Sequence, residues 1–207
     1  MRNRRKATTL VAALIASGAA VVATTHADAA GTTNSFRMHR SPGIVSADCV
    51  PHARAEVTIR NEGPVEVMKV HATGLPSRTD FDLFVIQVPN APFGVSWYQG
   101  DLETNRDGVA NGTFVGRFNE ETFAVAPGTA PAPSVHSSPT ADATSNPAFA
   151  PVHTFHLGLW FNSPDDATAA GCPGNVTPFN GEHNAGVQVL NTAQFGDQHG
   201  PLRRLKP

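Results

Sequence analysis

Histidines are the side chains best suited to chemistry in this sequence, because imidazole is a common ligand of transition metals in β proteins. Four of them follow residue 151: His153, His156, His183 and His199. Side chains two apart on a strand share a face, so His153 and His156, three apart, should point to opposite faces. We treat the four as candidate ligands of a transition-metal site, with surface or hydrogen-bonded histidines as the alternative.

A second group of candidate ligands lies in an acidic turn with the sequence DLETNRDG, residues 101–108. Glu103, Asn105 and Asp107 alternate before a glycine, as oxygen ligands and the turn glycine do in calcium-binding loops. The first ligand position holds Glu rather than Asp, and Phe114 stands where a second acid would be expected. A hairpin turn built on Asn and Asp-Gly is the alternative interpretation.

A third group is aromatic. Trp97, Tyr98 and Trp160 are the only tryptophan and tyrosine residues of the chain. Exposed aromatic side chains on a sheet stack on sugars or form a patch for a partner protein. The alternative is that a second sheet or a loop covers them.

No motif marks an enzyme. The stretch Gly94–Tyr98 lacks the second glycine of a hydrolase nucleophile elbow. No glycine-rich phosphate-binding motif follows any predicted strand, so the sequence gives no support to a Rossmann or P-loop fold.

The N-terminus has the features of a signal peptide. Four basic residues precede the apolar run 10–22, and the small residues Ala27 and Ala29 suit cleavage near residue 30. The run is shorter than a membrane span requires, although an uncleaved anchor is the alternative. We therefore expect residues 1–30 to be removed and the product to be secreted, extracellular and free of the membrane.

Charge and cysteine content limit the functions that remain. Without residues 1–30, 11 basic and 16 acidic residues give a formal charge of about −5, which disfavours nucleic acid as a partner. Cys49 and Cys172 are the only cysteines, and in an exported protein such a pair predicts a disulfide bond. A reactive or metal-binding thiol is the alternative.

The strand pattern predicts an all-β fold. The chain has 17 prolines and 18 glycines, few charges and frequent turn signals. Phe81–Val88 is apolar on both faces, which is typical of a central strand. These features favour an antiparallel β-sandwich, immunoglobulin-like in the broad sense, with a barrel or jelly roll as the alternative. Further strands are predicted at 55–60, 65–70, 95–98, 113–118, 122–126, 152–161 and 186–190.

The remaining segments complete one domain. Residues 31–51 are polar and predict an irregular N-terminal arm, and residues 52–207 form the sandwich domain. Residues 127–151 are rich in Pro, Ala, Ser and Thr and predict a long flexible loop or linker. Ser163, Pro164 and two following acids suit the start of a short helix that Gly171 ends.

Short motifs spread along the chain carry a resemblance. They are GLP at 74–76, TDFDLFVI at 79–86, FG at 93–94, WYQGD at 97–101, GRF at 116–118, HLGLWF at 156–161, CPG at 172–174 and GEHNAG at 181–186. Together they resemble a group of uncharacterised secreted proteins of actinomycetes and other soil bacteria. The resemblance spans most of the chain after residue 30 and implies export and a single domain. It implies no activity and no catalytic residue.

The leading expectation from the sequence is therefore a secreted, non-catalytic β-sandwich module that binds an extracellular glycan or protein. The first alternative is a metal-dependent extracellular enzyme that uses the histidines after residue 151. A weaker one is an envelope-associated protein in which residues 127–151 act as a spacer.

Overall fold

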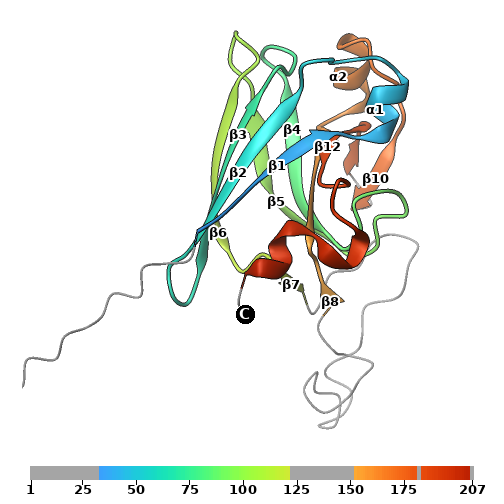
Figure 1. Ribbon diagram of the computed structural model, residues 1–207. Helices are drawn as coiled ribbons and strands as arrows, with labels where there is room; N and C mark the ends of the chain where they lie inside the picture. Colours follow the sequence, from blue (N-terminus) through green and yellow to red (C-terminus); the bar gives the residue numbers. More distant parts are fainter. Residues whose placement is uncertain (1–32, 122–151, 181–182, 206–207) are drawn as a thin grey trace, which may run out of the picture. The chain divides into compact units, whose positions relative to one another are not determined.

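One antiparallel sheet dominates the protein, whose computed structural model describes residues 33–121, 152–180 and 183–205. Its strand order is β5-β4-β9-β12-β1-β2-β3-β6, and the sheet curls until it nearly closes into a barrel (Figure 1). The all-β, antiparallel prediction is confirmed. The strands are β1 (Thr33–Arg40), β2 (Arg54–Asn61), β3 (Glu66–Thr73), β4 (Asp80–Ile86), β5 (Ser96–Glu103), β6 (Ala110–Gly116), β9 (His156–Phe161) and β12 (Gln188–Asn191).

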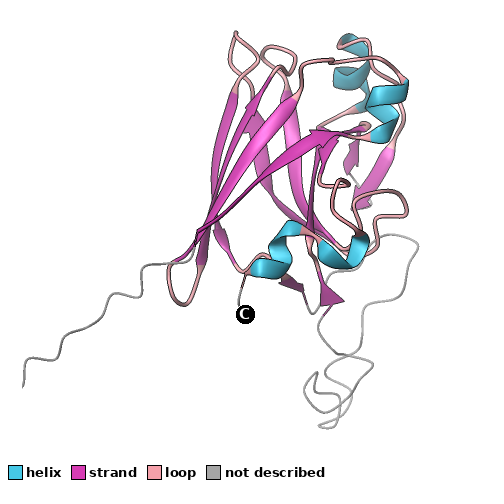
Figure 2. Cartoon of the chain, in the orientation of Figure 1, coloured by secondary structure: helices cyan, strands magenta, loops and turns pink. Residues whose placement is uncertain are grey.

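The helices are short and lie at the ends of the sheet (Figure 2). Ser163 caps the predicted helix, where its hydroxyl accepts a hydrogen bond from the Asp166 amide, so this prediction is confirmed. Two small two-stranded sheets, β7–β8 and β10–β11, lie apart from the main sheet. The elements outside the main sheet are α1 (Pro42–Ser46), β7 (Glu120–Glu121), β8 (Val152–His153), α2 (Pro164–Ala169), β10 (Thr177–Asn180), β11 (His183–Ala185), and the 3-10 helices η2 (Asp197–His199) and η3 (Pro201–Arg204).

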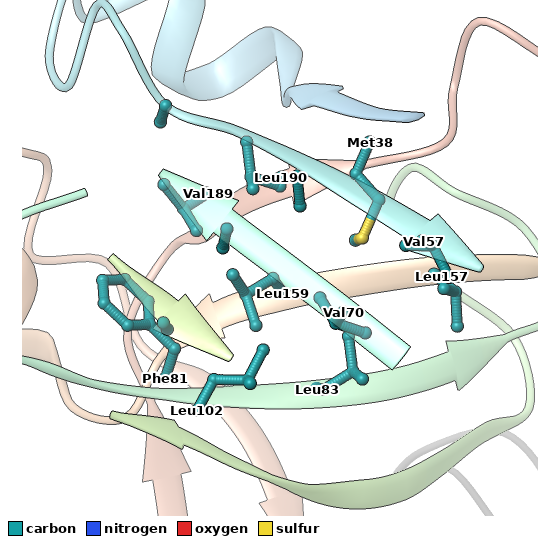
Figure 3. Packing of buried hydrophobic residues seen from close by; sticks show 14 of the residues in the cluster. Met38, Val57, Val70, Phe81, Leu83, Leu102, Leu157, Leu159, Val189 and Leu190 are labelled. Atoms are coloured by element: carbon teal, nitrogen blue, oxygen red, sulfur yellow. The ribbon is translucent and has the colours of Figure 1, made fainter. Parts of the chain in front are cut away.

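The core lies inside the curl of the sheet and is apolar (Figure 3). Alternation along each strand sends every second side chain inward, as Val57, Val70, Leu83 and Leu159 illustrate. Each such side chain contributes about 1.5–3 kcal/mol of hydrophobic free energy when it is fully buried. The inner faces of all eight strands therefore hold the curl together.

Both ends of the curl are closed by chain that does not belong to the sheet. At one end, Ile44 of α1 and Ala167 of α2 are fully buried in the core cluster. At the other end, Leu202 and Leu205 of the C-terminal segment join the same cluster. Figure 1 shows α1 and α2 at the upper end of the sheet and the C-terminal segment at the lower end. No helix of the described residues is long and apolar enough to cross a membrane.

The predicted disulfide is confirmed. Cys49 and Cys172 are bonded and buried, with their Cα atoms 5.4 Å apart. Cys49 follows α1 and Cys172 follows α2, so the bond ties the two helices that close one end of the sheet. A disulfide hints at an oxidising setting, since such bonds persist mainly outside the cytosol.

The prediction for residues 31–51 is wrong, because this segment holds β1 and α1 instead of an irregular arm. The inward positions of β1 include Asn34 and Arg40 beside Phe36 and Met38, so polar residues interrupt the apolar alternation. Asn34 is buried because its amide donates to the Pro201 carbonyl, 2.8 Å away, which no local pattern predicts.

The finer prediction, a sandwich of two sheets, is not confirmed. β1 pairs with β2 through residues 33–38 and with β12 through residues 39–40. One strand thus joins both halves into a single sheet. The predicted strand at 122–126 and the predicted loop at 127–151 lie outside the described residues.

We expect that replacing both cysteines, as Cys49→Ser with Cys172→Ser, lowers the free energy of unfolding by up to about 4–5 kcal/mol. The bond closes a loop of 123 residues, and the unfolded chain regains that loop entropy. Urea unfolding checks this, and reductant should bring the wild type to the variant's stability without affecting the variant. A variant as stable as the oxidised wild type would contradict the expectation.

Candidate functional site

The outer face of β4, β5 and β9 carries the aromatic and acidic side chains that could take part in binding or chemistry. Because Phe81 and Leu83 point into the core, alternation places Asp82 and Phe84 of β4 on the outside. The register sets Asp82 opposite Asp101 of β5 on one side and opposite Trp160 of β9 on the other. This row, and the row of Phe84 opposite Tyr98, bring residues from distant parts of the sequence together.

Aromatic rings form the centre of this face. The Phe84 ring lies 5.4 Å from that of Tyr98 and 5.5 Å from that of Trp160, and Phe93 meets Trp160 edge-on at 4.9 Å. Trp160 is fully buried, whereas Tyr98 is 49% exposed. The aromatic stack therefore extends from the buried ring of Trp160 to the half-exposed ring of Tyr98.

Gly158 makes room for this stack. A Cβ atom at this position would lie 2.3 Å from Cζ3 of Trp160 and 2.7 Å from Nε2 of Gln188. The indole consequently lies over the backbone of residue 158, on the strand face opposite to the core. A larger residue there would push Trp160 away from Phe84.

Four carboxylates lie beside the stack in two opposed pairs. Asp80 faces Glu103 in register, and Asp82 faces Asp101. Like charges directly opposite on antiparallel strands repel each other. Among the described residues, Asp80, Asp101 and Glu103 form no ion pair with a basic side chain. The outer face of β4 and β5 therefore has a negative potential.

Tyr98 links the carboxylates to the aromatic stack. Its phenol donates a hydrogen bond to Oδ1 of Asp101. Partial burial raises the pKa of Tyr98 well above its usual value, and the hydrogen bond to Asp101 and the charges of Asp101 and Asp82 act in the same direction. The phenol therefore stays neutral and keeps donating at any physiological pH.

The three aromatic residues predicted to form one patch do not lie on one face. Trp97 is 43% exposed, but it pairs with Val85, whose side chain points into the core. Trp97 and Tyr98 therefore project from opposite faces of β5. Trp160 shares the face of Tyr98 but is covered by Phe93 and by Ala185 of β11.

The proposed calcium ligands lie in a turn closed by its own hydrogen bonds. Oδ1 of Asn105 accepts the amides of Asp107 and Val109, at 2.9 and 3.0 Å. Gly108 adopts a φ of +69°, and a Cβ there would collide with the Leu75 carbonyl. Glu103 is exposed on β5 and faces Asp80. The geometry matches the alternative of a hairpin turn, because Oδ1 of Asn105 already accepts two backbone amides.

The candidate metal ligands are not grouped in the described part of the chain. His153 is exposed and stacks on Phe155, and His199 is also exposed. His156 is fully buried, with one ring nitrogen hydrogen-bonded to Thr192 and the other to the Asp197 carbonyl. The structure describes the backbone of His183 in β11. No three His, Cys, Asp or Glu residues among those described could hold one metal ion together.

Sequence reasoning missed the acidic rows and the buried polar residues of β12. Asp80 with Asp82, and Asp101 with Glu103, are spaced two apart, and this spacing was the available signal for a shared face.

Gln188 and Asn191 of β12 are buried and hydrogen-bonded to each other, and Asn191 also donates to the Pro89 carbonyl. These bonds hold the loop that carries Phe93 against the sheet.

Comparison with protein-family models, with curated proteins and with solved structures finds no match.

We expect Gly158→Ala to lower the free energy of unfolding by about 1–3 kcal/mol, because the new methyl group overpacks the face against Trp160. Urea unfolding followed by tryptophan fluorescence checks this. Gly43→Ala is the matched control, since a Cβ at Gly43 meets nothing within 4 Å. Equal stability of the two variants would contradict the expectation.

We expect Glu103→Lys to raise the free energy of unfolding by roughly 0.2–1 kcal/mol at low ionic strength, because a repulsive pair with Asp80 becomes attractive. Glu56→Lys is the control, since Glu56 already pairs with Arg37 at 3.2 Å and should gain nothing. Chemical denaturation at low and high salt measures both. A gain that persists in 1 M salt would show that charge is not its cause.

Proposed function

We propose that the protein is a secreted, non-catalytic binding module that holds an extracellular ligand on the outer face of β4 and β5. The observation that carries this proposal is the ring of Tyr98, half exposed yet fixed by Phe84 beneath it and Asp101 beside it. A rigid aromatic surface ring loses little conformational entropy when a ligand stacks on it.

The ligand that this face suits best is a glycan without acidic groups. Sugar rings stack on tyrosine, and carboxylates accept hydrogen bonds from sugar hydroxyls. Asp101, which is hydrogen-bonded to Tyr98, and Glu103, further along β5, are exposed and supply such acceptors. Their negative charge, like the net charge of the chain, disfavours acidic polysaccharides. A protein ligand with a neutral or basic contact surface is the alternative.

Export is part of this proposal and rests on two supports. The N-terminal thirty residues have the pattern of a signal peptide. The buried disulfide suits an oxidising compartment. We also retain the sandwich as the proposed description of the packing, because the β2–β3 half and the β4–β9 half share one core.

The metal-dependent enzyme receives no support from the described histidines, since both ring nitrogens of His156 bond within the protein. The module is therefore proposed to bind without cleaving.

We expect Tyr98→Ala to weaken glycan binding about three- to tenfold, the worth of one aromatic stacking contact. The measurement is a panel of neutral oligosaccharides, such as β-1,4-linked glucose and N-acetylglucosamine oligomers, titrated against residues 31–207 by calorimetry. Tyr98→Phe should lose less, because it keeps the ring and loses only the bond to Asp101.

Trp97→Ala is the matched control, because Trp97 is similarly exposed but lies on the other face of β5. Loss of binding in Trp97→Ala with full binding in Tyr98→Ala would place the ligand on the wrong face for this proposal. Chromatography of the bound oligosaccharide should show no shorter product. Cleavage would contradict the non-catalytic assignment.

A further inference from the structure

The C-terminal segment, residues 196–205, closes one end of the sheet and is named here the C-terminal strap. Leu202 and Leu205 insert into the core. Its backbone is attached by hydrogen bonds from Asn34 to the Pro201 carbonyl at 2.8 Å, from Asn119 to the Leu205 carbonyl at 2.9 Å, and from the Leu202 amide to the Phe155 carbonyl at 3.1 Å. The strap is thus packed against the start of β9.

His156 is the one titratable side chain of the described residues that is fully buried between the sheet and the strap. Its Nε2 lies 3.0 Å from the Asp197 carbonyl, which can only accept, so Nε2 carries the proton and donates. Its Nδ1 lies 2.9 Å from Oγ1 of Thr192 and therefore accepts from that hydroxyl. The neutral imidazole is fully satisfied.

A second proton on the ring would disturb this arrangement. Nδ1 would become a donor aimed at Oγ1 of Thr192, which already accepts the Leu157 amide at 3.2 Å. The Thr192 hydroxyl would have to turn its own proton away from the ring. The strap packs closely on the ring, since a Cβ at Gly200 would lie 2.8 Å from Cδ2 of His156.

The surroundings of His156 favour its neutral form. Burial lowers the pKa of His156 below its usual value. The hydrogen bond to the Asp197 carbonyl, the charge of Asp197 and the backbone groups of Thr192 and Gly196 oppose this only in part. Its neighbours on the sheet carry no charge: Ile86 is its partner on β4, and Thr192 follows β12. Asp197, on the strap, is the charged group that acts on the ring.

We propose that His156 and the C-terminal strap form a proton-sensitive latch, in which protonation of the imidazole releases the strap and exposes the end of the core around Leu202 and Leu205. The latch uses neither Tyr98 nor the carboxylates of β4 and β5. It would make one end of the module labile in acidic surroundings while the sheet stays folded.

The direction of the pH dependence follows from the shifted pKa. In the open state the imidazole is hydrated and titrates near pH 6.5, whereas in the closed state its pKa is lower. Above about pH 6.5 both states hold neutral His156 and the latch has its full stability. As the pH falls from about 6.5 towards the closed-state pKa, the open state gains the proton first and becomes more populated.

The test is amide hydrogen exchange of residues 31–207 at pH 7.5 and pH 5.0, corrected for the intrinsic exchange rates. We expect protection of the strap amides to fall by up to about 30-fold at pH 5.0 relative to the amides of β2 and β3, the limit that titration of the open state near pH 6.5 sets. In His156→Gln, which cannot titrate, the strap should have the same protection at both pH values. His153→Gln changes an exposed histidine and should behave as the wild type.

Asp197→Asn provides a second variant that keeps the imidazole. Removing this carboxylate removes a charge that favours protonation of His156 in the closed state, so the pKa of His156 there falls further and the loss of strap protection at pH 5.0 should be at least as large as in the wild type. Undiminished strap protection at pH 5.0 in the wild type would overturn the proposal. So would an equal loss of protection in β2 and β3, or a pH dependence that persists in His156→Gln.

Discussion

The structure depends on the burial of β4 and β9 on both faces. Their inner side chains meet in the core, where the Phe81 and Phe161 rings are 5.0 Å apart. Their outer side chains, among them Phe84 and Trp160, form a second apolar cluster that the sheet alone cannot cover. Since exposing these rings would cost hydrophobic free energy, the chain must supply a further layer from its loops and from β10–β11.

That further layer explains why polar residues gather on the outer face. A covering loop brings backbone carbonyls that need donors, and Asn191 donates to the carbonyl of Pro89. His156 does the same for the strap through the carbonyl of Asp197. The buried polar side chains of the outer face thus hold the covering loop and the strap in place through hydrogen bonds. Where the cover ends, at β5, the side chains of Tyr98, Asp101 and Glu103 are exposed, whereas Asp82 of β4 is buried.

The candidate site could be predicted only in fragments. Tyr98 was identified from its residue type, and it is exposed as a binding surface requires. Trp160 was assigned to the same patch, but the sequence does not contain the information that Phe93 would cover it. Asp80 and Glu103 are far apart in the chain, and only the antiparallel register of β4 and β5 makes them opposed neighbours.

Features that depend on local periodicity and on covalent chemistry can be read from the sequence alone. Ala55, Val57 and Ile59 alternate and therefore form a strand with one buried face, and two cysteines in one chain formed the single bond available to them. The tertiary structure decided which strands are neighbours, that β1 joins both halves, and that His156 lies beneath the strap. The physical reason is that strand pairing and the cover of an outer face arise from contacts between residues remote in sequence, for which a local pattern carries no signal.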